Sequence, residues 1–401
     1  MSNYFYLEVL MSRDSRCERQ LAVRRFLNGE KPSSICTSLS RSRAWLYKWV
    51  NCYDPDDSTW CESRSTRPAT NPNRTSREIE EIVKLVRLDL YNSKDDLFYG
   101  AQAILWELED LGVHPLPSER TINRILGRNN LTVRRTGPYK PKGTPYPELP
   151  ADRPNQTHQA DLVGPRYLKG PIRFHSQNVL DIASVRCGLE PLLSKAGQSI
   201  INAFWVIWQR LGIPENLQID NELSYYGSHR YPRGMGPLIR LCLHNGVEPW
   251  FIPMAEPWRN GAIENFNNHY KQKFLRKVTM TSWDELKEGS IAFENRHNNH
   301  ARYSKLGGKT PLKALSGWGT KLIFPEEKTP PAQPIPKPET GRYHLVRLIR
   351  SNQKISIFGE LFHVAPELQY QYVVATIDVK EQKLKLYQDK VQVDEFKYKL
   401  R

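Results

Sequence analysis

The spacing of apolar residues divides the first third of the chain into short helices. In residues 13–52 apolar positions recur three or four residues apart, with a break at Gly29 and a new start at Pro32. Residues 75–131 repeat this pattern over three further segments, and Ser118 stands where it would cap the third. The pattern predicts two successive helix-turn-helix modules. Small helical bundles with a solvated basic face are the alternative.

The remaining two thirds of the chain show strand character. Residues 155–315 alternate short apolar runs with amphipathic stretches such as 199–212, which predicts an α/β domain with a mixed sheet. Within it, residues 178–192 read as one strand. Residues 340–400 alternate apolar and polar positions and are rich in Val, Ile and Tyr, which predicts a small all-β barrel.

Stretches rich in proline and turn-forming residues separate these modules. Proline lacks a backbone donor and interrupts helices, so each such stretch reads as a linker. The expected organisation is a helix-turn-helix module at 1–53, a linker at 54–74, a second helix-turn-helix-like module at 75–135, a linker at 136–154, an α/β core at 155–324, a Pro-rich linker at 325–339 and the β-barrel at 340–401.

Charge and composition narrow the possible partners. The chain has 58 Lys and Arg against 43 Asp and Glu, a formal net charge of +15, so a polyanion is the natural partner. Charge alone does not separate nucleic acid from an anionic membrane. No uncharged apolar stretch reaches the roughly 18 residues of a membrane span. The six cysteines form no close pairs, so we expect reduced thiols in a cytoplasmic, nucleoid-associated protein.

Three acids stand where the α/β pattern places functional groups. Asp161 lies in the first apolar run, Asp220 ends the short run LQID, and Glu264 falls early in a helix after Asn260-Gly261. The first two are separated by 58 residues and the last two by 43. Carboxylates at strand ends and on a helix over the sheet can converge, and three of them suit two Mg²⁺ or Mn²⁺ ions. Singly, each acid is explained as well by a strand end, an Asx-turn or a helix dipole.

Three local segments resemble one family. Gln159-Ala160-Asp161, IDNE at 219–222 and PWRNGAIENFN at 257–267 are similar to the signatures of insertion-sequence DDE transposases with a retroviral-integrase-type catalytic core. The resemblance implies an RNase H-like core with a mixed five-stranded sheet. It also implies that the three acids bind the two metal ions, with water as nucleophile for cleavage and a DNA 3′-hydroxyl for strand transfer.

The resemblance also suggests DNA contacts. Lys271 and Asn268 lie on the helical face of Glu264, where the family often carries basic residues, and Asn221 would steady the loop after Asp220. The interval before Glu264 is longer than in many relatives, and 227–236, with Arg230 and Arg233, looks like the inserted loop. Further basic candidates for DNA binding are Arg259 in the core and Arg41, Arg43, Lys48, Arg120 and Arg124 in the helical modules.

The function these features predict is a DNA transposase or integrase acting on double-stranded DNA, at element ends and target, as a homo-oligomer without membrane involvement. A non-catalytic DNA-binding regulator or domesticated derivative is the alternative, and a nuclease without strand transfer is a third. His297 and His300 stand one turn apart, but no further ligands nearby support a zinc site.

Overall fold

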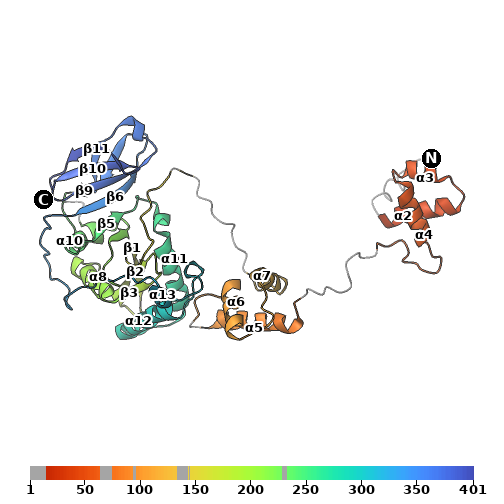
Figure 1. The fold of residues 1–401 in the computed structure, drawn as a ribbon, viewed down its shortest axis with the longest axis horizontal. Coiled ribbons are helices and arrows are strands. Elements are labelled where there is room, and N and C mark those ends of the chain that lie inside the picture. The colour runs from red at the N-terminus through yellow and green to blue at the C-terminus, as the bar shows by residue number, and fades with distance from the viewer. Residues whose placement is uncertain (1–14, 64–74, 94–95, 133–142, 144, 228–232) are drawn as a thin grey trace. The chain divides into compact units, whose positions relative to one another are not determined.

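The computed structural model describes residues 15–63, 75–93, 96–132, 143, 145–227 and 233–401. It divides into two compact units, residues 1–74 and 75–401, which are described separately (Figure 1). No helix in the described ranges is both long enough and apolar enough to cross a membrane.

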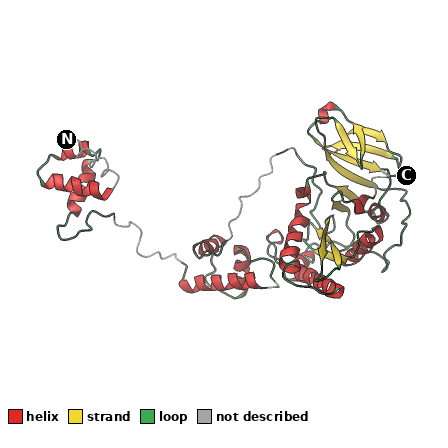
Figure 2. Cartoon of the chain, turned by 180° about the vertical axis from the view of Figure 1, so that it is seen from behind, coloured by secondary structure: helices red, strands yellow, loops and turns green. Residues whose placement is uncertain are grey.

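The described residues of the first unit, 15–63, form a bundle of three helices, which confirms the predicted helical segments (Figure 2). The helices are α2 (Ser15–Leu27), α3 (Pro32–Ser38) and α4 (Arg43–Cys52). They pack around Ala22, Ile35 and Leu46, each fully buried. The hydroxyl of Ser42 accepts a hydrogen bond from the Trp45 backbone N–H and so caps α4, the third helix of the bundle.

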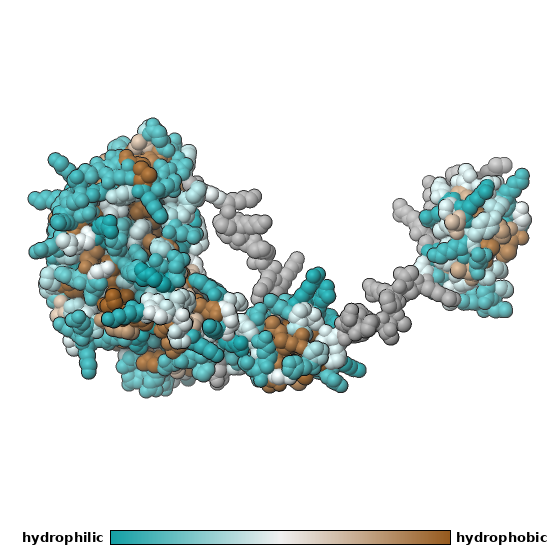
Figure 3. All heavy atoms as spheres, in the orientation of Figure 1, coloured by the Kyte–Doolittle hydropathy of each residue, from teal (hydrophilic) through white to brown (hydrophobic). Residues whose placement is uncertain are grey.

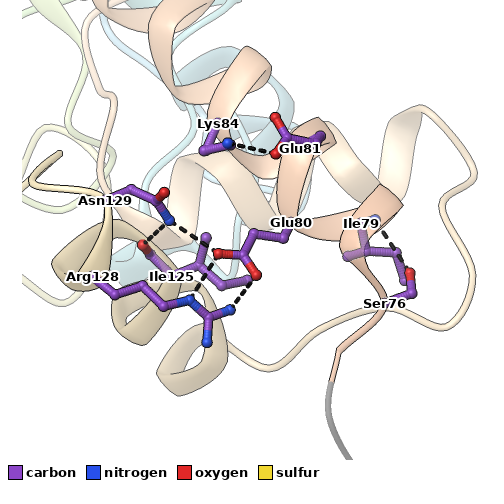
Figure 4. A network of polar contacts seen from close by, with 8 residues as sticks. All are labelled: Ser76, Ile79, Glu80, Glu81, Lys84, Ile125, Arg128 and Asn129. Carbon is purple, nitrogen blue, oxygen red and sulfur yellow. Dashed lines mark hydrogen bonds and ion pairs between the residues drawn. The ribbon is translucent and has the colours of Figure 1, made fainter.

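The second unit begins with three more helices, α5 (Arg77–Asn92), α6 (Ala101–Asp110) and α7 (Glu119–Arg128). Ser118 caps α7 as predicted, because its hydroxyl accepts from the Thr121 N–H. Arg128 and Asn129, at the end of α7, both donate to the carboxylate of Glu80 on α5 (Figure 4). This network fixes α7 against α5 at the helix ends.

A mixed sheet forms the centre of the second unit. Its strands are β1 (Thr157–Tyr167), β2 (Arg173–Asp181), β3 (Cys187–Leu192), β4 (Asn216–Ile219) and β5 (Glu248–Phe251). Their order is β3-β2-β1-β4-β5, antiparallel from β1 to β3 and parallel from β1 to β5. The prediction of one strand at 178–192 is wrong. The chain reverses at 182–186, where Val185 has a positive φ and the Asp181 carboxylate accepts from the Ser184 hydroxyl and N–H.

Helices cover both faces of this sheet. Val179 and Leu180 point to opposite sides, as neighbours on a strand must. Val179 belongs to the same buried cluster as residues of α8 (Gly197–Leu211) and α10 (Pro237–His244). Leu180 belongs to the cluster with residues of α11 (Gly261–Tyr270) and α12 (Trp283–Asn299). These four helices are labelled around the strands in Figure 1. The shorter helical elements are α9 (Leu223–Tyr226), η1 (Pro257–Asn260), η2 (Lys271–Leu275, a π-helix), η3 (Ser304–Leu306), α13 (Pro311–Leu315) and η4 (Pro366–Leu368).

The C-terminal strands extend the core sheet, which corrects the expectation of a separate small barrel. They are β6 (Arg342–Leu348), β7 (Lys354–Ile357), β8 (Glu360–His363), β9 (Tyr372–Asp378), β10 (Lys383–Gln388) and β11 (Val391–Lys397). β6 pairs in parallel with β5, Trp250 opposite His344, and β9, β10 and β11 follow to give nine strands. β7 and β8 pair with each other as a second, two-stranded sheet. The reason is physical: β5 would otherwise expose an unpaired edge.

The Pro-rich segment 325–339 is packed against the core. The indole N–H of Trp205 on α8 donates to the Glu327 carbonyl at 3.1 Å, and Arg240 on α10 donates to the Ile335 carbonyl at 2.8 Å. Ile335 itself is buried in the large hydrophobic cluster shared by the core and the C-terminal strands. This segment therefore connects the two groups of strands along the face that α8 and α10 cover.

Candidate active site

Two of the three predicted acids lie side by side on neighbouring strands. β1 and β4 pair with Gln159 opposite Gln218, and continuing that register brings Asp161 beside Asp220, which directly follows β4. Paired strands lie about 4.8 Å apart. The preceding residue on each strand belongs to the cluster under α8 and α10, so both carboxylates face the other side of the sheet, where α11 lies.

Burial raises the pKa of both carboxylates, and repulsion from neighbouring carboxylates adds to the effect. Burial raises the pKa of Asp161, although Lys271 and a hydrogen bond from Asn267 act against it. Burial, with the neighbouring charge of Asp161, raises the pKa of Asp220 from 3.8 to about 6. The carboxylate of Glu222 adds negative charge nearby while pairing with Lys195 at 3.0 Å. A site with this field attracts cations.

Helix α11 is anchored to β1 along its first turns. The Asn260 side chain donates to the Ala160 carbonyl at 3.0 Å, and the Ile263 N–H donates to the Gln159 side chain at 3.1 Å. Asn267 completes this line by donating to Oδ2 of Asp161 at 2.6 Å. The orientation of α11 over the aspartates is therefore set by polar contacts as well as by apolar packing.

Glu264 lies on the face of α11 that these contacts define. It is four residues after Asn260 and three before Asn267, which are the spacings of neighbours on one helical face. Its side chain is half-buried. However, within the described ranges no three His, Cys, Asp or Glu side chains are grouped closely enough to hold a metal. The structure thus brings Asp161 and Asp220 together and leaves Glu264 on the adjoining helix face.

The donor chemistry at this site suits divalent cations. Carboxylate oxygens are hard ligands of the kind Mg²⁺ and Mn²⁺ prefer, and the repulsion within the Asp161–Asp220 pair is relieved by a cation between them. Two carboxylates form a partial ligand set. The third predicted acid, Glu264, lies on α11, whose first turns are anchored to β1.

Two residues at this site, Asn178 and Asn267, were not among the predicted site residues. Asn178 lies opposite Asp161 in the β1–β2 register and donates to the Asn267 side chain at 2.6 Å. Asn267 therefore has its amide oxygen occupied and its N–H₂ directed at Asp161. The sequence could have indicated Asn267, because it follows Glu264 by three residues and so lies on the same face of α11.

The predicted DNA-contact residues of the core have unequal surroundings. Lys271 begins the π-helix η2 and is close enough for its charge to lower the pKa of Asp161. Asn268 is exposed on α11. Arg259 is already engaged, since it pairs with Glu256 at 3.0 Å and lies 4.0 Å from the ring centroid of Tyr146.

Asn221 connects the loop after Asp220 to the C-terminal strands. Its side chain donates to the Ile252 carbonyl at 2.7 Å and accepts from the Arg347 guanidinium at 2.9 Å. Arg347, on β6, also donates to the carbonyls of Ser356 and Ile252, and its burial lowers its pKa to about 10. The position of the loop that carries Asp220 thus depends on a residue from the last part of the chain.

Family models match two regions of the chain. The model described as integrase core domain matches residues 245–311, which contain Glu264 and Lys271, and the model described as homeodomain-like domain matches residues 13–57. The chain carries an integrase core domain. Its homeodomain-like domain covers the three helices of the first unit. None of the curated proteins compared with the chain matches it.

Solved structures similar to the integrase-core chain include three retroviral proteins. The HTLV-2 integrase catalytic core domain in complex with magnesium is 16% identical over 41% of this chain and 97% of that chain, with a TM-score of 0.32. The simian T-cell lymphotropic virus intasome in complex with PP2A regulatory subunit B56 gamma is 14% identical over 80% and 97%, with a TM-score of 0.37. The BIV integrase catalytic core domain is 13% identical over 41% and 95%, with a TM-score of 0.31.

The basic DNA-binding candidates in the helical modules differ in their surroundings. Arg43 and Lys48 on α4, and Arg120 and Arg124 on α7, are exposed. Arg41 instead forms a two-pronged pair with Glu18, both contacts at 2.9 Å.

Two further expectations concerned the margins of the integrase core. In the loop 227–236, Arg233 pairs with Glu360, while Arg230 lies outside the described residues. His297 is buried with its Nε2 2.8 Å from the Val185 carbonyl, and burial lowers its pKa to about 4. These contacts make His297 a packing residue between α12 and the β2–β3 turn.

Proposed function

We propose that this chain is a DNA transposase or integrase that uses Mg²⁺ or Mn²⁺ to cleave phosphodiester bonds at element ends and to join those ends to target DNA. The observation that carries the proposal is the pair Asp161 and Asp220, adjacent on neighbouring parallel strands under α11, the helix that lies in the region matched by the integrase core model. The core is assigned to residues 155–324, the DNA-binding modules to 1–53 and 75–135, and a supporting β-module to 340–401.

The proposed chemistry divides between the acids and the residues that hold them. Asp161, Asp220 and Glu264 would hold two divalent ions, which when bound supply activation of the attacking oxygen and stabilisation of the leaving one. Asn267 orients Asp161 by donating a hydrogen bond to its Oδ2 at 2.6 Å. Lys271, whose charge acts to lower the pKa of Asp161, would bind a phosphate of the DNA strand.

DNA recognition is proposed for the helical modules. Arg43 and Lys48 on α4 would contact one stretch of duplex, since the matching homeodomain-like model covers this helix. Arg120 and Arg124 project from α7, the third helix of the second module, in the same manner. Their charge is suited to phosphates and base edges of the major groove. We infer that two or more copies act together, because two element ends must be joined.

A non-catalytic DNA-binding role is the second candidate. It is favoured by the fact that no three acidic or other ligand side chains are assembled among the described residues. In that role the chain would bind element ends without cutting them. The adjacent aspartates would then be a remnant of the fold.

One experiment separates the candidates. A labelled duplex carrying the element end is incubated with supercoiled target DNA and Mg²⁺, Mn²⁺ or EDTA, and the products are resolved on a denaturing gel. Joined products support the proposal, cleavage alone indicates a nuclease, and binding alone indicates a regulator. Asp161→Asn, Asp220→Asn and Glu264→Gln should each abolish joining. Glu288→Gln, a substitution of an exposed glutamate on α12, should leave joining unchanged.

A further inference from the structure

A cavity of about 560 Å³ lies beside α11, on the side of the segment that leads into α6. Its walls come from residues 97–106 and from α11, η2 and the start of η3. The apolar part of the wall is mostly aromatic, and the charged side chains among its described lining residues are basic. The aromatic residues are Phe98, Tyr99, Trp106 and Tyr303, and the basic ones are His269, Lys273, Arg302 and Lys305.

Lys273 is the unusual member of this wall. Its side chain is only 8% exposed, yet its ammonium has no hydrogen-bond partner within the described ranges. The ammonium lies 5.0 Å from the ring centroid of Tyr99. Asp96 acts on it from a distance, and Arg87 and Lys277 add positive charge. Burying an ammonium that has no hydrogen-bond partner costs free energy, so an anionic ligand at this position would be stabilising.

The cavity is also suited to a flat ring. Trp106 is half-buried and has the Arg302 guanidinium 4.9 Å from its ring centroid, while Tyr303 meets Phe98 edge-on at 5.1 Å. Amide side chains of Gln102, Asn265 and Gln272 add hydrogen-bonding groups to the same wall. Simple packing of α6 on the core would fill such a space, because protein interiors are close-packed. Aromatic faces, amides and an unpartnered ammonium together are the chemistry that binds a nucleotide.

We propose that this cavity holds an unpaired nucleotide of a DNA strand, with its phosphate at Lys273 and its base on the aromatic wall that includes Trp106. The inference rests on the proposed function in taking DNA as the substrate, and it adds the strand feature that is recognised. Asn265 directly follows Glu264, so the cavity adjoins the helix that carries the third acid. A strand held here would run along α11.

The test measures binding in EDTA, so it does not depend on catalysis. Fluorescence anisotropy compares a blunt duplex with the same duplex carrying a short 5′ overhang that contains 2-aminopurine. The wild-type chain should bind the overhang duplex roughly 10-fold more tightly, in line with the contribution of one stacked base. The 2-aminopurine emission should be quenched on binding. Free deoxyadenosine monophosphate in competition distinguishes a site for single nucleotides from one that needs a strand.

Two substitutions assign the effect to the cavity. Lys273→Met keeps the buried stem and removes the ammonium, so it should lose most of the overhang preference while keeping blunt-duplex affinity and thermal stability. Lys277→Met removes an exposed charge that does not line the cavity and should retain the preference. Trp106→Leu should abolish the quenching.

Either of two results would overturn the inference: equal wild-type affinity for both duplexes, or an undiminished preference in Lys273→Met. Both leave strand joining in Mg²⁺ intact as a separate test of the proposed function. Conversely, a chain that never joins strands would still show the overhang preference if the cavity binds a nucleotide.

Discussion

Replacing Asp220 by Asn should stabilise the metal-free protein at neutral pH. The amide oxygen can still accept the Glu222 N–H, which binds Oδ1 of Asp220 at 3.2 Å, so the loop contact is kept. What is lost is a charge that is partly buried beside Asp161. The substitution therefore isolates the electrostatic strain of the pair.

The sign and size follow from the pKa of Asp220, which lies at about 6 in the folded protein against an ordinary 3.8. The folded state holds this proton more tightly than the unfolded chain does. Unfolding free energy therefore falls as pH rises through that interval, and the loss is complete above it. The difference corresponds to at most about 3 kcal/mol, an upper limit because the side chain is partly solvated.

Urea unfolding followed by tryptophan fluorescence measures this. In EDTA at about pH 7.5 the variant should exceed the wild type by up to that amount, and near pH 4 the two should agree. Added Mg²⁺ should stabilise the wild type and leave Asp220→Asn unchanged. Asp152→Asn, an exposed control, should alter neither curve. If Asp220→Asn is destabilised equally at both pH values, the aspartate pair is not strained and the reasoning fails.

Three further outcomes follow from the described contacts. Burial holds the pKa of His297 at about 4. The unfolding free energy should therefore drop by about 2 kcal/mol between pH 7 and pH 5, because the imidazole takes up a proton in the unfolded chain and stays neutral in the folded one. His297→Gln should flatten this pH dependence in urea titrations. Arg347→Met removes the donor to Asn221 and should slow strand joining at saturating DNA without weakening DNA binding; a change in affinity alone would contradict the positioning role. Gly188→Ala would place a Cβ 2.6 Å from Ile207 Cγ2 and should cost about 1–3 kcal/mol in thermal or urea unfolding, whereas unchanged stability would show that α8 can shift.

The sequence predicted best where local pattern and capping chemistry agree. The helices of both helical modules, and the cap at Ser118, follow from apolar spacing and one hydroxyl. The adjacency of Asp161 and Asp220 was expected from their places in strand-like runs, and the β1–β4 register supplies its geometric basis. The side of α11 that bears Glu264 was also readable, because helical spacing relates it to Asn260 and Asn267.

The misses have physical reasons. Residues 182–186 include Ile182 and Val185, which favour strands, so the local sequence predicts a continuous strand. The turn depends on the contacts between Asp181 and Ser184. The pairing of β6 with β5 joins residues far apart in sequence, and alternation within a strand does not identify its neighbour.

Because β6 continues the sheet from β5, the second unit cannot be shortened before its last strands without breaking the sheet. Truncation within residues 325–339 would strip a neighbour from β5, uncover apolar side chains that Tyr343 and Leu345 now shield, and leave backbone groups ready to pair with other molecules. A shortened fragment would therefore tend to aggregate, and soluble expression of the core should require all nine strands.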